Sequence, residues 1–150
     1  MQDSEKITEI ILAIFRLNGR IIAWGDSLSG EFGLTSARWQ VLGAIALAEA
    51  PQTVPEIADR MGVTRQATQK QVNLLEGEGL VRKRANPRHR RSPHYLLTEA
   101  GERAYARVSE KYQAWAREAV KDAPAGALDG ALEGLRFLGA KLPGIEGEPS

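Results

Sequence analysis

The segment that decides the fold runs from Thr53 to Thr98 and reads TVPEIADRMGVTRQATQKQVNLLEGEGLVRKRANPRHRRSPHYLLT. It contains two short helical patterns, and then two strand-like patterns that flank an arginine-rich turn. The first helix begins at Thr53, whose hydroxyl can accept a hydrogen bond from the amide of Glu56 while the Glu56 side chain reaches back, as in a capping box. Gly62 supplies the stop that a tight turn between two helices needs.

Thr64 can cap the second helix, whose residues sort into two faces under the 3.6-residue period. Val72 and Leu75 mark the apolar face. The opposite face carries polar and basic side chains: Thr64, Arg65, Gln66, Gln69, Lys70 and Asn73. Arginine can pair bidentately with guanine, and glutamine or asparagine with adenine, while Thr64 and Lys70 suit phosphates. Ordinary solvated helices carry the same residue types, so this face alone favours base contact and plain solvation about equally.

Two short strand patterns, 80–84 and 95–97, follow the second helix. Between Arg82 and Arg91 there are six basic side chains and no acidic one, and their mutual repulsion in a hairpin would be relieved by a bound anion. We expect three arginines near the tip to reach the DNA backbone or the adjacent minor groove: Arg88, Arg90 and Arg91. The order of elements predicts a winged helix-turn-helix, a module that places its second helix in the major groove.

The regional charge balance supports this interpretation, although the whole chain carries 20 Lys+Arg against 19 Asp+Glu. Residues 1–50 carry 4 basic and 6 acidic side chains, residues 51–98 carry 9 and 4, and residues 99–150 carry 7 and 9. The middle region is therefore +5 between two flanks of −2. A face that binds a polyanion predicts this asymmetry. The alternative is a solvated basic hairpin that has no partner.

The composition excludes several classes of function. With 150 residues and 43% hydrophobic side chains, the chain predicts one soluble globular domain. It has no cysteine, which excludes disulfides and thiol chemistry. No secretory signal and no apolar run of about 18 residues is present, which predicts a cytoplasmic protein without a membrane span. No phosphate-binding glycine loop or nucleophile elbow occurs, and the two histidines, His89 and His94, lie on the basic hairpin. The sequence therefore predicts no enzyme, no cofactor and no metal site, a site using these histidines with distant acids being the alternative.

Apolar residues at helical spacing predict further helices on both sides of the winged segment. One stripe lies near the N-terminus: Ile7, Ile10, Ile11, Ile14, Leu17, Ile21 and Trp24. We expect Gly25, Gly30 and Gly33 to break this helix, and Thr35 or Ser36 to cap the next. A helix of about 24 residues should follow Thr98, and another helix should follow Pro124. These expectations divide the chain into an N-terminal dimerisation helix and linker, the DNA-binding region, and the C-terminal dimerisation helices: 1–34, 35–98 and 99–150.

Residues 33–101 resemble the MarR family of bacterial transcription regulators. The matching pieces are Trp39-Gln40-Val41-Leu42, Ile57-Ala58, Met61-Gly62-Val63, Leu75-Glu76-Gly77-Glu78-Gly79-Leu80-Val81, the turn from Asn86 to Arg91, and Leu97-Thr98 with Gly101. The resemblance implies a mainly α homodimer with a small β-hairpin wing, which binds an inverted-repeat operator in double-stranded DNA. In many members a small-molecule pocket lies between the dimerisation and DNA-binding parts. The resemblance favours a repressor released by a small aromatic or anionic effector.

Two alternatives, and a departure from the family pattern in the wing, accompany this interpretation. A winged helix can serve protein–protein contact, and a cleft near Trp24 and Trp39 would suit a small-molecule-binding protein in which DNA binding is incidental. The departure lies in the wing, where His89 replaces the usual aspartate two residues before Arg91. A neutral imidazole cannot form the ion pair that would orient the guanidinium. We therefore expect a wing that is more mobile or more dependent on phosphates for its order.

Overall fold

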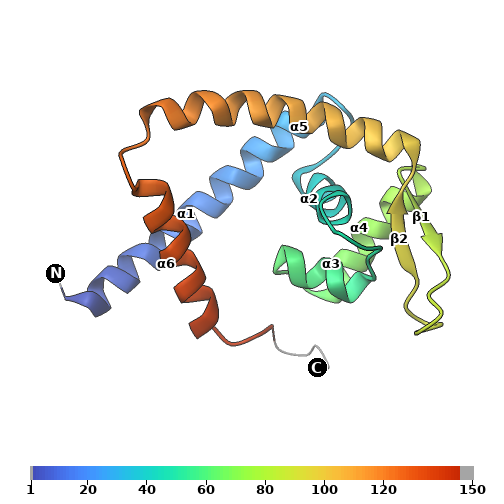
Figure 1. The fold of residues 1–150 in the computed structure, drawn as a ribbon, viewed down its shortest axis with the longest axis horizontal. Helices are drawn as coiled ribbons and strands as arrows, with labels where there is room; N and C mark the ends of the chain where they lie inside the picture. The colour runs from blue at the N-terminus through green and yellow to red at the C-terminus, as the bar shows by residue number, and fades with distance from the viewer. Residues whose placement is uncertain (1, 146–150) are drawn as a thin grey trace.

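The computed structural model describes residues 2–145 as a mainly helical chain with one antiparallel hairpin (Figure 1). Its elements, in chain order, are α1 (Asp3–Gly30), α2 (Ser36–Ala46), α3 (Val54–Met61), α4 (Arg65–Gly77), β1 (Val81–Arg84), β2 (His94–Leu97), α5 (Glu99–Ala119), the 3-10 turn η1 (Val120–Asp122) and α6 (Ala127–Lys141). The predicted fold class is confirmed. Among the described residues, no helix combines the length and hydropathy needed to cross a membrane.

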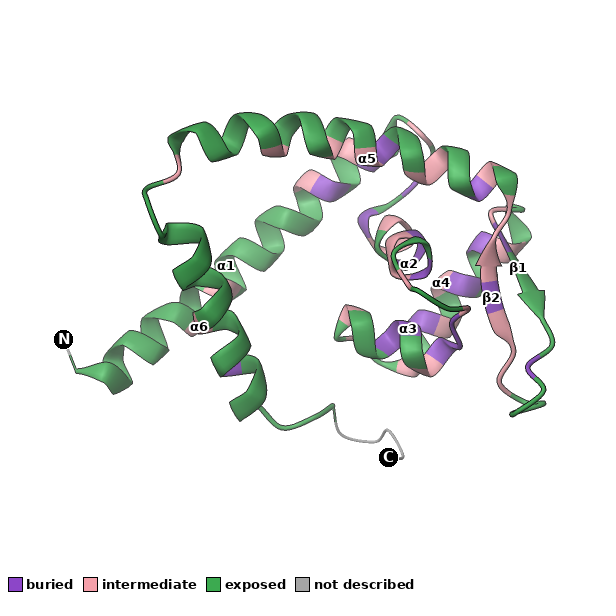
Figure 2. Ribbon diagram, viewed as in Figure 1, coloured by how far each residue is buried: buried purple, intermediate pink, exposed green. Residues whose placement is uncertain are grey.

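The buried core lies where α2, α3, α4, the hairpin and the first half of α5 meet. Figure 2 shows buried residues gathered in this part of the molecule, while most of α1 and α6 is exposed. The core consists of aliphatic side chains and one tyrosine: Leu34, Val41, Leu42, Ile45, Val54, Ile57, Val72, Leu75, Val81, Tyr95 and Val108. The helix-turn-helix and the hairpin therefore share one core, which fixes their relative orientation.

The first helix is longer than the sequence predicts, because Gly25 does not end it. α1 continues to Gly30, and Gly25 is buried inside it. A Cβ atom at Gly25 would lie 2.6 Å from the hydroxyl oxygen of Ser36, in the first turn of α2. Beside it, the amide of Ser36 donates to the Asp26 carboxylate at 2.7 Å. This glycine permits close packing of two helices; the expectation that it breaks the helix was wrong.

The predicted helix starts are confirmed by the cap hydrogen bonds. The hydroxyl oxygens of Thr53 and Thr64 accept from backbone amides three residues ahead, at 3.4 and 3.1 Å. Gly62 ends α3 in the left-handed conformation with a φ of 66°, which a residue with a side chain rarely adopts. The capping box differs in its return half, because the Glu56 carboxylate accepts from the Thr53 hydroxyl at 2.9 Å instead of from its amide.

The hairpin is tied to α5 by a short polar junction. β1 and β2 pair in register from Val81 with Leu97 to Arg84 with His94. The Thr98 hydroxyl donates to the carbonyl of Gly79 at 2.6 Å and accepts from the amide of Gly101 at 3.1 Å, so one side chain closes the hairpin and caps α5. α5 and η1 together span residues 99–122, which agrees with the predicted 24-residue helix.

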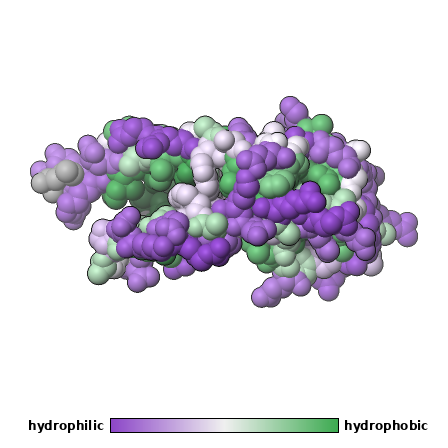
Figure 3. All heavy atoms as spheres, turned by 90° about the horizontal axis from the view of Figure 1, so that it is seen from above, coloured by the Kyte–Doolittle hydropathy of each residue, from purple (hydrophilic) through white to green (hydrophobic). Residues whose placement is uncertain are grey.

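The two ends of the chain expose large apolar side chains. Figure 3 shows apolar atoms around a hollow on the left of the view, where α1, α6 and the end of α5 lie. The exposed side chains on these elements include Ile7, Ile10, Phe15, Leu17, Ile21, Trp115, Leu128, Leu132, Leu135 and Phe137. A monomeric soluble protein rarely leaves a patch of this kind in water.

We predict that Gly101→Ala destabilises the winged segment. A Cβ atom there would lie 2.0 Å from the carbonyl oxygen of Leu80, so the junction between β1 and α5 must open. The free energy of unfolding should fall by about 1–3 kcal/mol, as for an overpacked core, in denaturant titrations followed by circular dichroism. Gly77→Ala is the matched control, because no atom lies within 4 Å of its added methyl group. Equal stability of the Gly101 variant and the wild type would contradict this assignment.

Candidate nucleic-acid interface

α4 separates the predicted contact residues from the core. Its buried residues are Thr68, Val72 and Leu75. On the opposite side, Gln66, Lys70 and Asn73 are exposed, and Thr64 is exposed at the cap. Arg65 and Gln69 are half-buried at the edge that faces the hairpin. The two faces predicted from the 3.6-residue period are therefore the two faces of the folded helix.

The turn of the hairpin is ordered by Asn86, which is buried although it lies near the tip. Its side-chain amide donates to the carbonyl of Ser92 at 2.9 Å, and its side-chain oxygen accepts from the amide of Arg88 at 3.1 Å. These bonds close the loop on itself without the carboxylate that the family pattern supplies. The sequence interpretation placed no role on Asn86, although asparagine is a common residue for loops of this kind.

Five arginines of the hairpin are exposed to solvent: Arg82, Arg84, Arg88, Arg90 and Arg91. Within residues 2–145 none of them forms an ion pair, whereas Lys83 lies 3.5 Å from the carboxylate of Glu76. Like charges concentrated on one loop repel each other in water and attract a polyanion. The hairpin is thus a cationic arm whose exposed arginines could pair with an anion.

α4 and the hairpin line two common clefts. One, of about 320 Å³, is lined by Arg65, Gln66, Gln69 and Arg91 together with residues at the start of α3. The other, of about 900 Å³, is lined by Arg65 of α4, by Arg88 and by both histidines of the hairpin. Helix and arm residues predicted from sequence therefore come together on one side of the molecule.

Four predicted residues lie outside these clefts, one of them Thr64 at the exposed cap of α4. Lys70 and Asn73 line a shallow surface with Gln66 and Gln69 on the outer side of α4. Arg90 is exposed at the tip of the hairpin. These positions extend the basic surface beyond the clefts on both sides. His89 and His94 lie on the hairpin as expected, and among the described residues no cluster of histidine and acidic side chains could hold a metal ion.

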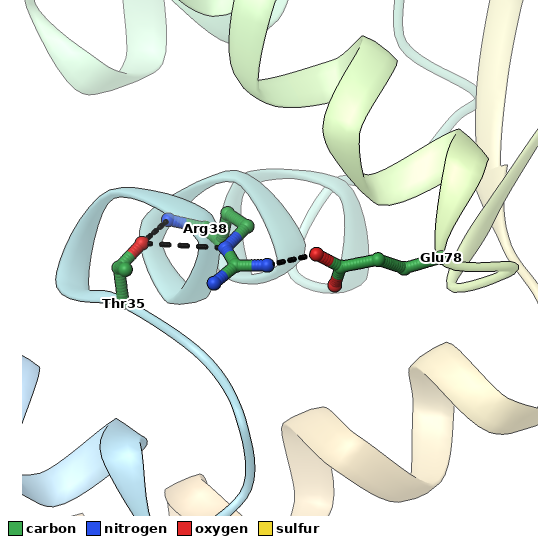
Figure 4. A network of polar contacts seen from close by, with 3 residues as sticks. All are labelled: Thr35, Arg38 and Glu78. Carbon is green, nitrogen blue, oxygen red and sulfur yellow. Dashed lines mark hydrogen bonds and ion pairs between the residues drawn. The ribbon is translucent and has the colours of Figure 1, made fainter.

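The far end of α4 is anchored to α2 by an ion pair between Arg38 and Glu78 (Figure 4). The Thr35 hydroxyl accepts from the backbone amide of Arg38 at 3.2 Å and from its Nε at 3.5 Å, which directs the guanidinium toward Glu78. The pair joins residues 40 positions apart. No local sequence pattern predicts this ion pair, because no motif connects residues so far apart in the sequence.

The structure also places Tyr95 directly behind the interface. Its ring is buried in the core, while its hydroxyl oxygen accepts from Nε2 of Gln69 at 3.4 Å. The sequence interpretation used Tyr95 only as a strand residue. A buried tyrosine usually needs a hydrogen-bond partner, and that requirement is the signal that could have drawn attention to it.

A separate cavity, of about 510 Å³, lies between α2, the end of α3 and α5. Aromatic rings of Trp39, Tyr105 and Tyr112 line it, and Arg60 supplies a positive charge. Trp24 does not line the cavity; its ring lies 6.5 Å from that of Trp39, measured between ring centroids. The cleft expected near Trp24 and Trp39 therefore exists on the Trp39 side only.

Comparisons with known proteins agree with this geometry. A profile described as the MarR family matches residues 32–92. An uncharacterized protein of Mycobacterium tuberculosis is 38% identical over 108 residues, which cover 72% of this chain and 74% of the relative.

Two solved structures have the same fold. The transcriptional regulator BldR from Sulfolobus solfataricus superimposes with a TM-score of 0.82 at 23% identity, covering 95% of this chain and 100% of that chain. CouR from Rhodococcus jostii, bound to p-coumaroyl-CoA, superimposes with a TM-score of 0.76 at 20% identity, covering 91% and 95%.

Proposed function

This chain belongs to the MarR family of DNA-binding transcriptional regulators, and from that premise we propose that it is a homodimeric repressor of an inverted-repeat operator. The observation that carries the proposal is the meeting of α4 with the cationic arm around common clefts. A helix in the major groove and a basic arm beside it must face the same side of the duplex. The five arginines without ion pairs among the described residues supply the charge that phosphates would neutralise.

The proposed contacts divide by chemistry. Residues of α4 and its cap lie in or beside the major groove: Thr64, Arg65, Gln66, Gln69, Lys70 and Asn73. Arg88, Arg90 and Arg91 reach the backbone or the adjacent minor groove. Base contacts set specificity, whereas phosphate contacts set position and affinity. Variants of α4 should therefore change sequence specificity, whereas variants of the arm should change affinity for all duplexes.

We predict that Arg65→Ala weakens discrimination between operator and scrambled duplexes by about 1–3 kcal/mol. Arg88→Ala should weaken binding to all duplexes alike and reduce the slope of log affinity against log salt by about one. Fluorescence anisotropy at several salt concentrations measures both. Arg117→Ala, an exposed arginine near the end of α5, is the matched control.

Two outcomes would contradict this division. If Arg65→Ala kept full discrimination, its assignment to base contact would be wrong. If the wild type bound every duplex weakly and equally at any salt, its DNA binding would be incidental. The winged helix would then serve protein–protein contact instead.

The dimer is proposed from the apolar faces of α1 and α6. Leu132 and Leu135 of α6 each remain 51% exposed, and Phe15 of α1 remains 69% exposed. Complete burial of an exposed side chain of this size contributes about 1.5–3 kcal/mol, and covering the exposed part of these side chains contributes a corresponding fraction of that. A second copy with two-fold symmetry would cover these faces and present two winged segments to an inverted repeat. Residues 1–34 and 99–150 would then form the dimerisation part, and 35–98 the DNA-binding part.

We predict that the wild type has the mass of two chains at micromolar concentration. Leu132→Glu should raise the dissociation constant of the dimer by about a hundredfold or more, because symmetry repeats the loss of apolar contact and the buried charge. Sedimentation velocity measures both. Leu47→Glu changes a leucine that is 73% exposed and lies on neither α1 nor α6, so it should remain dimeric. A wild type that sediments as one chain would contradict the proposal.

The cavity beside α2 supports a small aromatic anion as the effector. Its aromatic walls suit a planar ring, and the guanidinium of Arg60 suits a carboxylate or phosphate. CouR, whose fold this chain shares, is bound to p-coumaroyl-CoA. Because α2 and α3 line the cavity and also pack against α4, a ligand that displaces them moves α4, the proposed recognition helix, together with them.

We predict that p-coumarate quenches tryptophan fluorescence and lowers operator affinity, since Trp39 lines the cavity. Phenol, which lacks the carboxylate, should bind more weakly. Arg60→Ala should weaken p-coumarate binding about fivefold, a modest effect because Arg60 is exposed. Arg107→Ala, an exposed arginine of α5 outside the lining, is the control. Unchanged fluorescence and operator affinity at millimolar p-coumarate would contradict this choice of effector.

A further inference from the structure

We infer that Tyr95 is a positioning residue for sequence readout: its hydroxyl fixes the side-chain amide of Gln69 so that Gln69 and Asn73 together read adenine and reject guanine. The inference rests on the proposed DNA-binding function and names the base chemistry of that site.

Tyr95 is held rigidly on every side. Its ring is buried in the core, with 2% of its surface exposed. Its backbone pairs with Lys83 of β1 on one edge, and on the other edge its amide donates to the carbonyl of Gln52 at 2.8 Å. A side chain enclosed in this way keeps its hydroxyl at one place relative to α4.

The hydroxyl lies against the recognition helix. Nε2 of Gln69 donates to the hydroxyl oxygen of Tyr95 at 3.4 Å and to Oδ1 of Asn73 at 2.8 Å. A primary amide has two N–H donors and one carbonyl acceptor. Both donors of Gln69 are therefore engaged within the protein, and its remaining capacity is the acceptor Oε1.

Asn73 completes the pattern. Its oxygen accepts from Gln69, which leaves both N–H groups of its Nδ2 for a ligand, and its side chain is exposed. The pair thus offers one acceptor, on Gln69, and one donor group, on Asn73. In the major groove adenine presents the complementary edge, with the N6 amino group as donor beside N7 as acceptor.

Guanine presents two acceptors, N7 and O6, at the same edge. Placed against Oε1 of Gln69, one of them would face another acceptor and lose its hydrogen bond with water. This unfavourable contact provides rejection as well as recognition. Without the Tyr95 hydroxyl, one N–H of Gln69 is released, and the amide can then turn to donate to guanine.

The test compares operator duplexes that differ by adenine or guanine at each position of the half-site. At one position the wild type should prefer adenine about tenfold. Tyr95→Phe should reduce that preference to about twofold while its affinity for the adenine duplex and its salt slope stay unchanged. Gln69→Ala should abolish the adenine preference at the same position. Combining Tyr95→Phe with Gln69→Ala should cause no further loss of preference. Gln71→Ala, a glutamine of the same helix outside the amide pair, is the matched control and should keep the full preference.

A second measurement reports on the free protein. In a proton–nitrogen correlation spectrum, the side-chain amide resonances of Gln69 should shift in Tyr95→Phe while the backbone resonances of the core stay in place. This change supports the inference without relying on DNA, and it shows that the variant is folded. Absence of the shift would overturn the inference.

The outcomes separate the inference from the function on which it rests. A wild type without preference at any position would overturn the proposed function and the inference together. A wild type with clear preferences, combined with a Tyr95→Phe variant of identical adenine preference, would overturn the inference alone. Equal weakening of all duplexes by Tyr95→Phe would also overturn it, because that result describes a structural residue.

Discussion

Burial of one face of α4 against the hairpin and α2 sets the orientation of the proposed DNA-binding surface. Val72 and Leu75 of α4, Val81 of β1 and Tyr95 of β2 are almost completely excluded from water. Each fully buried aliphatic side chain contributes about 1.5–3 kcal/mol to stability, so the recognition helix cannot rotate without losing much of the core. Its polar face is therefore directed outward, beside the cationic arm. The proposed interface follows from the packing behind it.

One part of the chain buries its apolar side chains within itself, and another part leaves them exposed. The winged segment encloses its core, whereas α1 and α6 expose isoleucine, leucine and phenylalanine side chains. Such faces are stable in water when another apolar surface covers them. A two-fold dimer would relieve this exposure and also set the separation between two recognition helices. Stability and operator symmetry would then have one physical origin.

Local sequence patterns predicted most of the fold because the deciding interactions are local. Thr53 and Thr64 cap helices through amides three residues ahead, and the left-handed φ of Gly62 ends α3; each leaves a recognisable spacing. Gly25 was misread because a helical glycine that breaks a helix and one that permits close packing look alike in sequence. Only the position of Ser36 in space distinguishes them.

The candidate site was predicted as a set of residues but not as an arrangement. Periodicity places Gln69 and Asn73 on one face, yet the contact between Gln69 and Tyr95 joins positions 26 apart. The pairing of Arg38 with Glu78 and the loop closure by Asn86 likewise depend on how distant segments pack and on the rotamers chosen. Tertiary packing decides these contacts, so one sequence does not reveal them.

We propose that two copies of this chain read DNA through α4 with the arm alongside. Selection of bound duplexes from a random pool tests it most directly. We expect enrichment of an inverted repeat whose half-sites lie about one helical turn, or 10 base pairs, apart from centre to centre. Recovery of unenriched duplexes, or of a single half-site bound by one chain, would contradict it.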